Sequence, residues 1–360
     1  MIRSGGGVRR GVSGLGSALS RRVAALALPA VIGLGAAVLA PADPIAAWPG
    51  SPFDPHSPQA QSILNLFVLV LLFSGLVFVL VESWLFLTIF RYRQRPGAPI
   101  PRQIAGHRTL EITWTAIPVV FLIIVFIFMV PTLSVIQPPA AAGASDPPLR
   151  VTVIGHQWWW EYRYPDLGII TANELHIPVG VPVALEITSD DVIHAFWVPE
   201  LNGKIDAVPG KINPLTFLAQ EAKVYGGQCT EFCGIQHAWM LNPVFADPPD
   251  VFNEWVRTQQ TPVPEPADPL LAAGRQVFLG STCVNCHTVA GTTAQARVGP
   301  DLSHLGGRTT LGAGVLTNTP ENLRTWLTDL HDVKPGARMP AFSYSDQDTE
   351  ALVAYLTSLK

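Results

Sequence analysis

Charged residues are scarce in this sequence. Asp, Glu, Lys and Arg make up only 14% of the 360 residues, compared with about 25% in ordinary soluble domains. The 23 basic and 27 acidic side chains leave a formal charge of −4, so the chain lacks the basic excess typical of nucleic-acid binding. A mean hydropathy of +0.30 excludes intrinsic disorder. With 33 prolines and 30 glycines the chain is also not made of membrane helices alone, so we expect a membrane-anchored, loop-rich protein.

Cysteine is equally scarce. The four cysteines form two close pairs about fifty residues apart, Cys229 with Cys233 and Cys283 with Cys286. Secreted domains that depend on disulfides carry more cysteines at more regular spacings. The pairs therefore favour metal or cofactor chemistry.

The N-terminus has the pattern of an export signal. Its first 22 residues hold five arginines and no acid, and an apolar run over 23–40 and a small-residue segment over 41–47 follow. This pattern predicts a signal peptide over 1–47, with cleavage after Ala47 as one option. The alternative is an uncleaved first membrane helix.

Two further apolar segments, 63–90 and 112–136, each exceed the roughly 20 residues that cross a bilayer. They predict a transmembrane hairpin within 48–140. The loop between them carries five arginines, whereas the segments 48–62 and 137–149 contain no Lys or Arg. The positive-inside rule then places the loop in the cytoplasm and everything after 136 on the outer face of a bacterial cell membrane.

The exported part divides into two units. Residues 146–260 alternate short β-rich runs with turns, which indicates a β-sandwich or barrel. Their 6 basic and 14 acidic side chains give a net charge of −8, which suits either a basic partner protein or simply a soluble surface. A proline-rich segment over 261–269 predicts a stiff linker. Residues 270–360 then predict a small all-α domain with helices at 270–279, 321–330 and 346–359.

The segment Cys283-Val-Asn-Cys286-His287 is the c-type haem attachment sequence, in which two thiols bind the haem covalently and the adjacent imidazole ligates the iron. Met339, one of only four methionines, is the favoured sixth ligand, and Pro300 is expected to orient the His287 ring. A thioether and an imidazole suit electron transfer. His304 or His331 as the sixth ligand remains an alternative, as does a packing role for Met339.

A second group of soft donors lies in the predicted sandwich. Thiolates, imidazoles and a thioether favour copper over magnesium or calcium, and two thiolates four residues apart can bridge two copper ions. The candidate ligands are His194, Cys229, Cys233, His237 and Met240. A structural zinc site and a disulfide between the two cysteines are the alternatives.

Together, these features resemble subunit II of haem-copper cytochrome c oxidase, in the variety with a fused C-terminal cytochrome c domain. The resemblance covers 50–360 and rests on the run 229–240, the two-helix anchor, the segment Asp191-Val-Ile-His-Ala-Phe-Trp-Val-Pro199, and the segment Gly155-His-Gln-Trp-Trp-Trp-Glu-Tyr-Arg-Tyr164. It implies a multidomain membrane protein: a transmembrane hairpin, a cupredoxin-like β-sandwich over 146–260 and a class I cytochrome c domain over 270–360.

The resemblance also implies residue roles. The ligands named above would bind a dinuclear copper A centre together with the backbone carbonyl of Glu231, whose side chain would reach a magnesium ion shared with subunit I. Trp158 matches the residue where electrons enter copper A from cytochrome c. Glu111 matches a carboxylate at the cytoplasmic mouth of a proton channel in subunit I, although a charged residue at the edge of a span can be merely an interfacial anchor. Asp191 and Asp206 are candidates for docking or for supporting the site.

The resemblance implies the electron-input subunit of an aerobic, proton-pumping terminal oxidase, in which subunit I carries the oxygen chemistry. The implied partners are subunit I, subunit III, the lipid bilayer, and an external electron-donor complex or a soluble cytochrome c. Three alternatives are considered. A subunit II of a quinol oxidase lacks the copper ligands in that family, and nitrous oxide reductase has a large catalytic propeller that does not fit in this chain. The third alternative is a copper-delivery or sensor protein.

Overall fold

The computed structural model describes residues 50–136 and 149–360. The predicted signal peptide over 1–47 lies outside these residues, as do the first residues of the predicted sandwich at 146–148 and the end of the predicted hairpin at 137–140.

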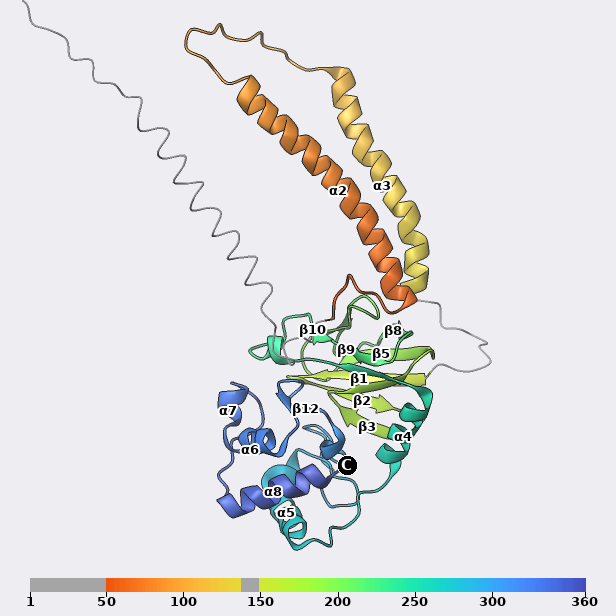
Figure 1. The fold of residues 1–360 in the computed structure, drawn as a ribbon, viewed down its shortest axis with the longest axis vertical. Helices are drawn as coiled ribbons and strands as arrows, with labels where there is room; N and C mark the ends of the chain where they lie inside the picture. The colour runs from red at the N-terminus through yellow and green to blue at the C-terminus, as the bar shows by residue number, and fades with distance from the viewer. Residues whose placement is uncertain (1–49, 137–148) are drawn as a thin grey trace, which may run out of the picture. The chain divides into compact units, whose positions relative to one another are not determined.

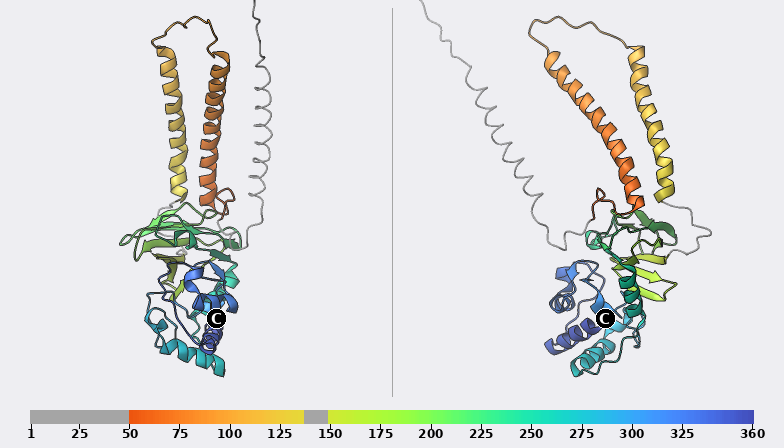
Figure 2. Two further views of the ribbon diagram at one scale, coloured as in Figure 1. Left: turned by 90° about the vertical axis from the view of Figure 1, so that its left-hand side faces the viewer. Right: turned by 45° about the vertical axis from the view of Figure 1, so that its right-hand side comes forward.

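Two long helices follow one another along the chain, α2 (Pro58–Arg91) and α3 (Arg108–Ile136). Both are long and apolar enough to cross a membrane, and they run side by side in both views of Figure 2, with the rings of Phe73 and Phe121 stacked between them. Ser57 caps α2 by accepting a hydrogen bond from the backbone N–H of Ala60. Helix α2 extends beyond its predicted apolar segment at both ends, and α3 does so at its N-terminal end only, because polar residues there continue the backbone hydrogen bonding.

The next unit is a β-sandwich (Figure 1). Its largest sheet has the order β3-β2-β1-β5-β8, in which β1 and β5 pair in parallel and the other neighbours are antiparallel. The strands of this sheet are β1 (Leu149–His156), β2 (Trp159–Tyr164), β3 (Ile169–Ala172), β5 (Val183–Ser189) and β8 (Asn213–Phe217).

Two three-stranded sheets complete the sandwich, with the orders β10-β6-β7 and β4-β11-β9. One core of buried side chains fills the unit, including Trp160, Tyr162, Phe196 and Phe217. The strands of these two sheets are β4 (Leu175–Pro178), β6 (His194–Trp197), β7 (Ile205–Ala207), β9 (Lys223–Tyr225), β10 (Gln228–Cys229) and β11 (Val244–Asp247).

Helix α4 (Pro249–Gln260) follows the sandwich and has no counterpart in the sequence-based expectation. Its apolar residues Val251, Phe252, Trp255 and Val256 span less than two helical turns of a mostly polar segment, which is too short a pattern to predict a helix. Phe252 is buried, and Trp255 packs on Tyr164 and His176. The proline-rich segment follows directly, and Asp268 then caps the next helix through the N–H groups of Leu270 and Leu271.

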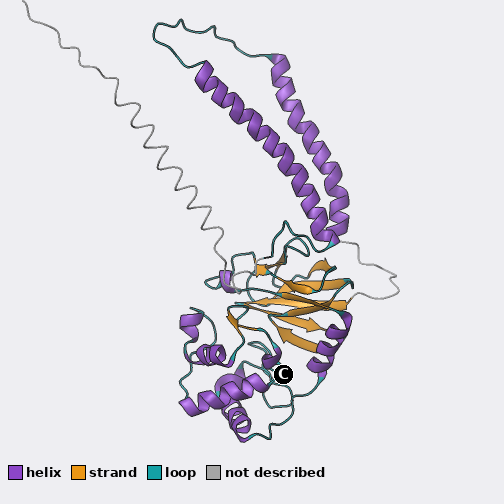
Figure 3. Cartoon of the chain, viewed as in Figure 1, coloured by secondary structure: helices purple, strands orange, loops and turns teal. Residues whose placement is uncertain are grey.

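The C-terminal unit is helical, apart from the short hairpin of β12 (Thr310–Leu311) and β13 (Leu316–Thr317), as Figure 3 shows. Helices α5 and α8 cross closely at Gly274, where an added Cβ would lie 1.9 Å from the carbonyl oxygen of Ala351. The helices are α5 (Pro269–Gly280), α6 (Pro320–Thr328), α7 (Leu330–Val333) and α8 (Asp346–Ser358), with 3₁₀ turns at Thr282–Asn285 and Leu305–Gly307.

The helix predicted over 321–330 ends two residues early, at Thr328, because the chain turns at Asp329 before the short α7. Ser345 caps α8 by accepting a hydrogen bond from the N–H of Asp348. A separate core of buried apolar side chains, among them Phe278, Leu323 and Tyr355, holds the helices together.

Candidate metal centres

One β-ladder positions the first two candidate copper ligands. Strand β10 pairs antiparallel with β6, with Cys229 opposite Phe196, and His194 begins β6. The chain then turns through the loop 230–236 and enters a 3₁₀ turn at His237. This path returns Met240 to the ladder, where its carbonyl accepts the N–H of Cys229 at 2.9 Å.

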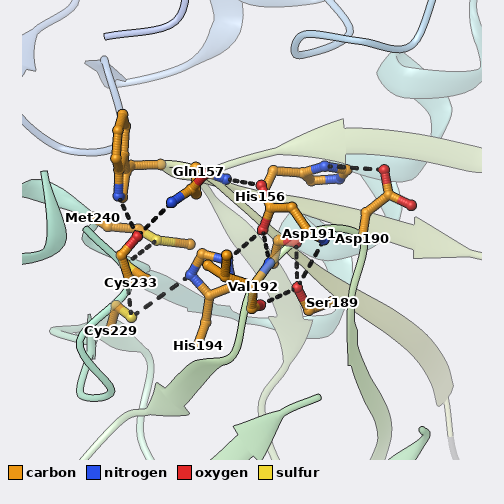
Figure 4. Close-up of polar contacts among 12 residues, drawn as sticks. His156, Gln157, Ser189, Asp190, Asp191, Val192, His194, Cys229, Cys233 and Met240 are labelled. Atoms are coloured by element: carbon orange, nitrogen blue, oxygen red, sulfur yellow. Dashed lines mark hydrogen bonds and ion pairs between the residues drawn. The ribbon is translucent and has the colours of Figure 1, made fainter. Parts of the chain in front are cut away.

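The five candidate side-chain ligands converge on one point, and Figure 4 shows four of them. The sulfur atoms of Cys229 and Cys233 lie 3.8 Å apart. His194 Nδ1 lies 4.0 Å from the Cys229 sulfur, and His237 Nδ1 lies 3.7 Å from the Cys233 sulfur. The thioether of Met240 is 3.9 Å from the Cys233 sulfur. Each thiol therefore lies beside its own imidazole, and the two thiols lie between the imidazoles.

This geometry fits two bridged soft metal ions better than the alternatives. The sulfur separation is far longer than the roughly 2.05 Å of a disulfide, and both cysteines are free. Structural zinc sites take four thiolate, imidazole or carboxylate ligands, whereas this site also directs a thioether at the sulfurs. Thiolate, thioether and imidazole ligands together are typical of copper.

Burial and hydrogen bonding prepare the thiols for a metal. Cys229, Cys233 and Met240 are all less than 5% exposed. The hydrogen bond from the Cys233 thiol lowers the pKa of Cys229, and the same contact together with burial raises the pKa of Cys233. The two shifts are opposite because the thiols share this contact, and metal binding would displace the thiol protons because thiolates are the ligands.

A second set of residues orients the ligands. Asp191 accepts a hydrogen bond from His194 Nε2 at 2.8 Å, which leaves Nδ1 directed at the sulfur of Cys229. Burial opposes protonation of His194, but Asp191 and Cys229 outweigh it and raise the pKa of this imidazole. The backbone N–H of Gln157 also donates to Asp191, at 2.7 Å. Such outer partners fix both the tautomer and the ring orientation of a metal-binding histidine.

Glu231 lies within the loop as predicted. Its carbonyl oxygen is 3.3 Å from the sulfur of Cys229, close enough to join the ligand set, whereas its side chain is exposed. Asp206 is also exposed, and only its backbone carbonyl is engaged, by Asn213.

The haem attachment sequence borders a cavity of about 620 Å³. The two thiols, His287 and Met339 all line this cavity, whereas His304 and His331 are not among its lining residues. The walls include Leu302, Leu305, Leu323, Trp326, Leu327 and Phe342. An apolar cavity with two thiols and two axial donors fits a covalently held haem.

His287 is held in the orientation that an axial ligand needs. Its Nδ1 donates to the carbonyl oxygen of Pro300 at 2.7 Å, which confirms the predicted role of Pro300 and leaves Nε2 free. Burial lowers the pKa of His287 and so favours the neutral ring, the form that binds a metal. A Cβ at Gly299 would lie 2.7 Å from this ring, so only glycine fits there.

Trp158 lies between the two centres. Its side chain lines the haem cavity, and its indole N–H donates to the carbonyl oxygen of Cys233 at 3.0 Å. The amide of Gln157 donates to the same oxygen at 2.6 Å. One aromatic side chain thus borders the haem cavity and directly contacts a candidate copper ligand.

Glu111 lies in the first turn of α3, away from both centres along the chain. Its carboxylate accepts a hydrogen bond from the N–H of His107 at 3.0 Å. This contact caps the helix, as is expected for an acidic side chain at a helix N-terminus.

Sequence reasoning missed several polar residues around the centres. Lys334 and Glu174 are 3% and 2% exposed, and Arg308, which directly follows the 3₁₀ turn Leu305–Gly307, lines the haem cavity. A lone lysine or glutamate between apolar residues carries no motif, so only the fold reveals that each is buried.

Three family models match the chain. "Cytochrome C oxidase subunit II, transmembrane domain" matches residues 50–133, "Cytochrome C oxidase subunit II, periplasmic domain" matches 168–246, and "Cytochrome c" matches 271–360. The first two place the chain among membrane-anchored oxidase subunits, and the third adds the fused cytochrome.

Related proteins of known name support the same family. The chain is 40% identical over 315 residues to cytochrome c oxidase subunit 2 of Alkalihalophilus pseudofirmus, covering 85% of this chain and 90% of the relative. It is 36% identical to the same subunit of Bacillus subtilis, covering 76% of this chain and 82% of that relative. The solved periplasmic domain of subunit II of cytochrome oxidase of Bradyrhizobium japonicum is 34% identical, with a TM-score of 0.31, and the match covers 31% of this chain and 93% of that domain.

The fold and the matched families define a membrane-bound subunit of an oxidoreductase complex. The chain belongs to the cytochrome c oxidase subunit II family, in the form with a C-terminal cytochrome c domain. The family implies a copper A centre in the sandwich and haem c in the helical domain, and the cluster of His194, Cys229 and Cys233 fits the former.

Proposed function

We propose that this chain is the electron-input subunit of an aerobic terminal oxidase, which passes electrons from its fused haem c through copper A to the oxygen-reducing site of subunit I. The observation that carries the proposal is the arrangement of the two thiols, each 3.7–4.0 Å from its own imidazole nitrogen. Proton pumping by the complex belongs to the same proposal. Subunit I and subunit III are the proposed partners within the complex.

The proposed copper A ligands are the five converging side chains and the Glu231 carbonyl. A copper pair held by these residues would delocalise one electron and would therefore exchange it with little reorganisation. The chain's own contribution is rigidity: the ladder between β6 and β10 and the hydrogen bond that His194 donates to Asp191 fix the positions of the ligands. The exposed side chain of Glu231 is free to reach a magnesium ion held jointly with subunit I.

The proposed haem ligands are His287 and Met339, with covalent attachment at Cys283 and Cys286. Met339 is favoured over His304 and His331 because it alone of the three lines the cavity. Trp158 is the proposed point of electron entry into the copper centre, since it borders the cavity and hydrogen-bonds to Cys233.

The alternative functions explain fewer of the observed features. A quinol oxidase subunit would have no use for the converged copper ligands, and a copper-delivery protein would have no use for the fused haem site.

The external donor, whether a donor complex or a soluble cytochrome c, would meet the acidic exported part of the chain. The proposed location is a bacterial cell membrane with both cofactor domains on the outer face and the predicted signal peptide 1–47 removed.

Metal analysis tests the central proposal. Purified full-length protein should contain two copper ions and one iron per chain. Cys229→Ser or His237→Ala should abolish the copper signal and leave haem staining intact, and Cys286→Ala should do the reverse. The proposal of two independent centres is wrong if each substitution removes both cofactors from a folded protein.

Glu111 is proposed to serve at the mouth of a proton channel in subunit I, and its capping contact with His107 supports the plainer anchoring role. Glu111→Gln separates the two, because a glutamine oxygen can still accept the N–H of His107 while the charge is lost. A channel role predicts slower turnover with unchanged reduction of copper A. Unchanged turnover would leave Glu111 as a helix cap only.

A further inference from the structure

Two buried ionisable side chains lie where the sandwich and the haem domain meet. Glu174 belongs to the sandwich, at the turn between β3 and β4, and Lys334 belongs to the haem domain, directly after α7. They are 2% and 3% exposed. Burying a charge is costly unless its hydrogen bonds are satisfied, so the partners of these two groups decide what the contact requires.

Lys334 takes its partners mainly from the sandwich. Its ammonium group donates to the carbonyl oxygens of Trp158 at 3.1 Å, Trp239 at 2.9 Å and Gly312 at 2.6 Å. An ammonium has three donors, so these three acceptors satisfy it. The first two belong to the sandwich: Trp158 borders the haem cavity, and Trp239 directly precedes the candidate copper ligand Met240.

Glu174 takes its partners from the haem domain. One carboxylate oxygen accepts the backbone N–H of Thr310 at 2.8 Å and the hydroxyls of Thr309 and Thr310 at 2.8 and 2.9 Å. The N–H of Thr309 donates to both oxygens, at 2.9 and 3.1 Å. The turn that carries Glu174 is fixed in its own domain, because Asn173 exchanges hydrogen bonds with the backbone of Trp160.

Further contacts join the haem domain to the segment 229–241, which carries four of the candidate copper ligands and is called the copper loop below. The N–H of Leu241 donates to the carbonyl of Ala313 at 3.1 Å, and the Gln236 amide donates to the carbonyl of Pro335. Gln236 lies between the candidate ligands Cys233 and His237. The haem domain therefore contacts the loop on both sides of His237.

These contacts hold the haem domain against the sandwich and also favour one orientation of it. Each of these buried groups is stable only when all its partners are in place, because a buried hydrogen-bonding group that loses its partner is strongly destabilising, and a charged one more so. Any rotation of the haem domain would break the contacts of Lys334 and Glu174 together. A merely hydrophobic contact would tolerate such a shift, since apolar attraction has no direction.

We propose that Lys334 and Glu174 form a reciprocal lock that holds the haem domain on the copper domain in one orientation during turnover, so that the haem does not swing on its linker. Lys334 is thereby a positioning residue: it aligns the backbone of Trp158 with the haem cavity and with the copper loop. The docking stands on the contacts alone, whereas its effect on electron transfer rests on the proposed function.

A cleavable linker tests the docking. A protease recognition sequence is inserted into the exposed segment between Pro266 and Asp268 of the otherwise intact, cofactor-loaded protein in detergent. After cleavage at micromolar concentration, the haem-bearing fragment should remain with the membrane-anchored fragment on size exclusion. Lys334→Met and Glu174→Gln should each weaken this association about tenfold or more, the effect of losing at least one satisfied buried hydrogen bond.

Lys360→Met is the matched control, because it removes one exposed positive charge from the same domain and should leave the fragments associated. Copper and iron contents show that each variant is folded. Release of the unsubstituted fragment on cleavage would overturn the lock, and so would full retention in both lock variants.

Electron transfer gives a second readout in the uncleaved chain. The lock predicts that haem-to-copper transfer is independent of solvent viscosity in the unsubstituted protein and becomes viscosity-dependent and about tenfold or more slower in Lys334→Met, with cofactor content unchanged. If haem-to-copper transfer were absent from all proteins while the cleavage results held, the proposed electron route would be wrong and the lock would stand. Viscosity-dependent transfer in the unsubstituted protein would contradict the lock.

Discussion

Asp191 accepts a hydrogen bond from Nε2 of His194 at 2.8 Å. The other oxygen of the same carboxylate lies 3.6 Å from the guanidinium of Arg338, which directly precedes the candidate haem ligand Met339. One side chain thus touches a candidate copper ligand and a neighbour of a candidate haem ligand. The hydrogen bonds from His194, Val192 and Gln157 overcome the effect of burial and lower the pKa of Asp191 to about 2, so the carboxylate is ionised at pH 7.

Asp191→Asn should weaken copper binding while leaving the haem site intact. An asparagine retains the shape but not the charge, and loss of such an outer partner typically costs about 10- to 100-fold in metal affinity. Competition with a copper chelator measures the effect. Asp190→Asn is the control, since Asp190 is a neighbouring exposed carboxylate that does not contact His194 in the described structure. Equal affinities for the two variants would remove Asp191 from the site.

Trp158→Phe keeps an aromatic ring and removes the N–H that donates to Cys233. We expect haem-to-copper transfer to slow by roughly tenfold, the consequence of losing a hydrogen bond worth about 1.4 kcal/mol. Rapid-mixing spectroscopy follows both centres. Trp159→Phe should have no such effect, because the Trp159 ring stacks on His156 instead of hydrogen-bonding to Cys233 in the described structure. A rate unchanged by Trp158→Phe would show that electrons enter elsewhere.

Met339→His should lower the reduction potential of the haem, because a thioether axial ligand raises the potential relative to imidazole. A redox titration monitored by visible spectroscopy reports the change. His304→Ala and His331→Ala should leave the potential unchanged, since neither residue lines the cavity. A drop in potential with either alanine variant, but not with Met339→His, would reassign the sixth ligand.

The acid stability of the sandwich should depend on Glu161, which is 3% exposed. Burial raises its pKa, but hydrogen bonds from His156 and Arg163 outweigh burial, so the net shift is downward from 4.5. Its contribution to stability is therefore full above about pH 4.5 and is lost as the pH falls through the lower folded-state pKa.

Glu161→Gln should lower the free energy of unfolding at pH 7 by about 1.5–3 kcal/mol, the range for hydrogen bonds to charged groups. It should also flatten the loss of stability below pH 4.5. Urea unfolding of the full-length protein at several pH values measures both effects. Glu186→Gln, an exposed site on β5, should change neither, and an equal response at the two sites would exclude a special role for Glu161.

The sequence by itself determined the two long apolar segments, and it predicted the haem attachment residues and the copper ligands. Each of these depends on short-range information: an apolar run of sufficient length, or donor residues at fixed spacings such as Cys283, Cys286 and His287. The fold class followed from the same patterns and from the resemblance, and it is confirmed.

Only the tertiary structure decided how the centres are supported and joined. The contact of His194 with Cys229 spans 35 residues, that of Lys334 with Trp158 spans 176, and that of Glu174 with Thr310 spans 136. No local pattern encodes such pairings, because a lone Lys or Glu has the same local sequence signal whether exposed or buried. The long-range packing of two domains buries these charges, and burial makes their hydrogen-bond partners obligatory.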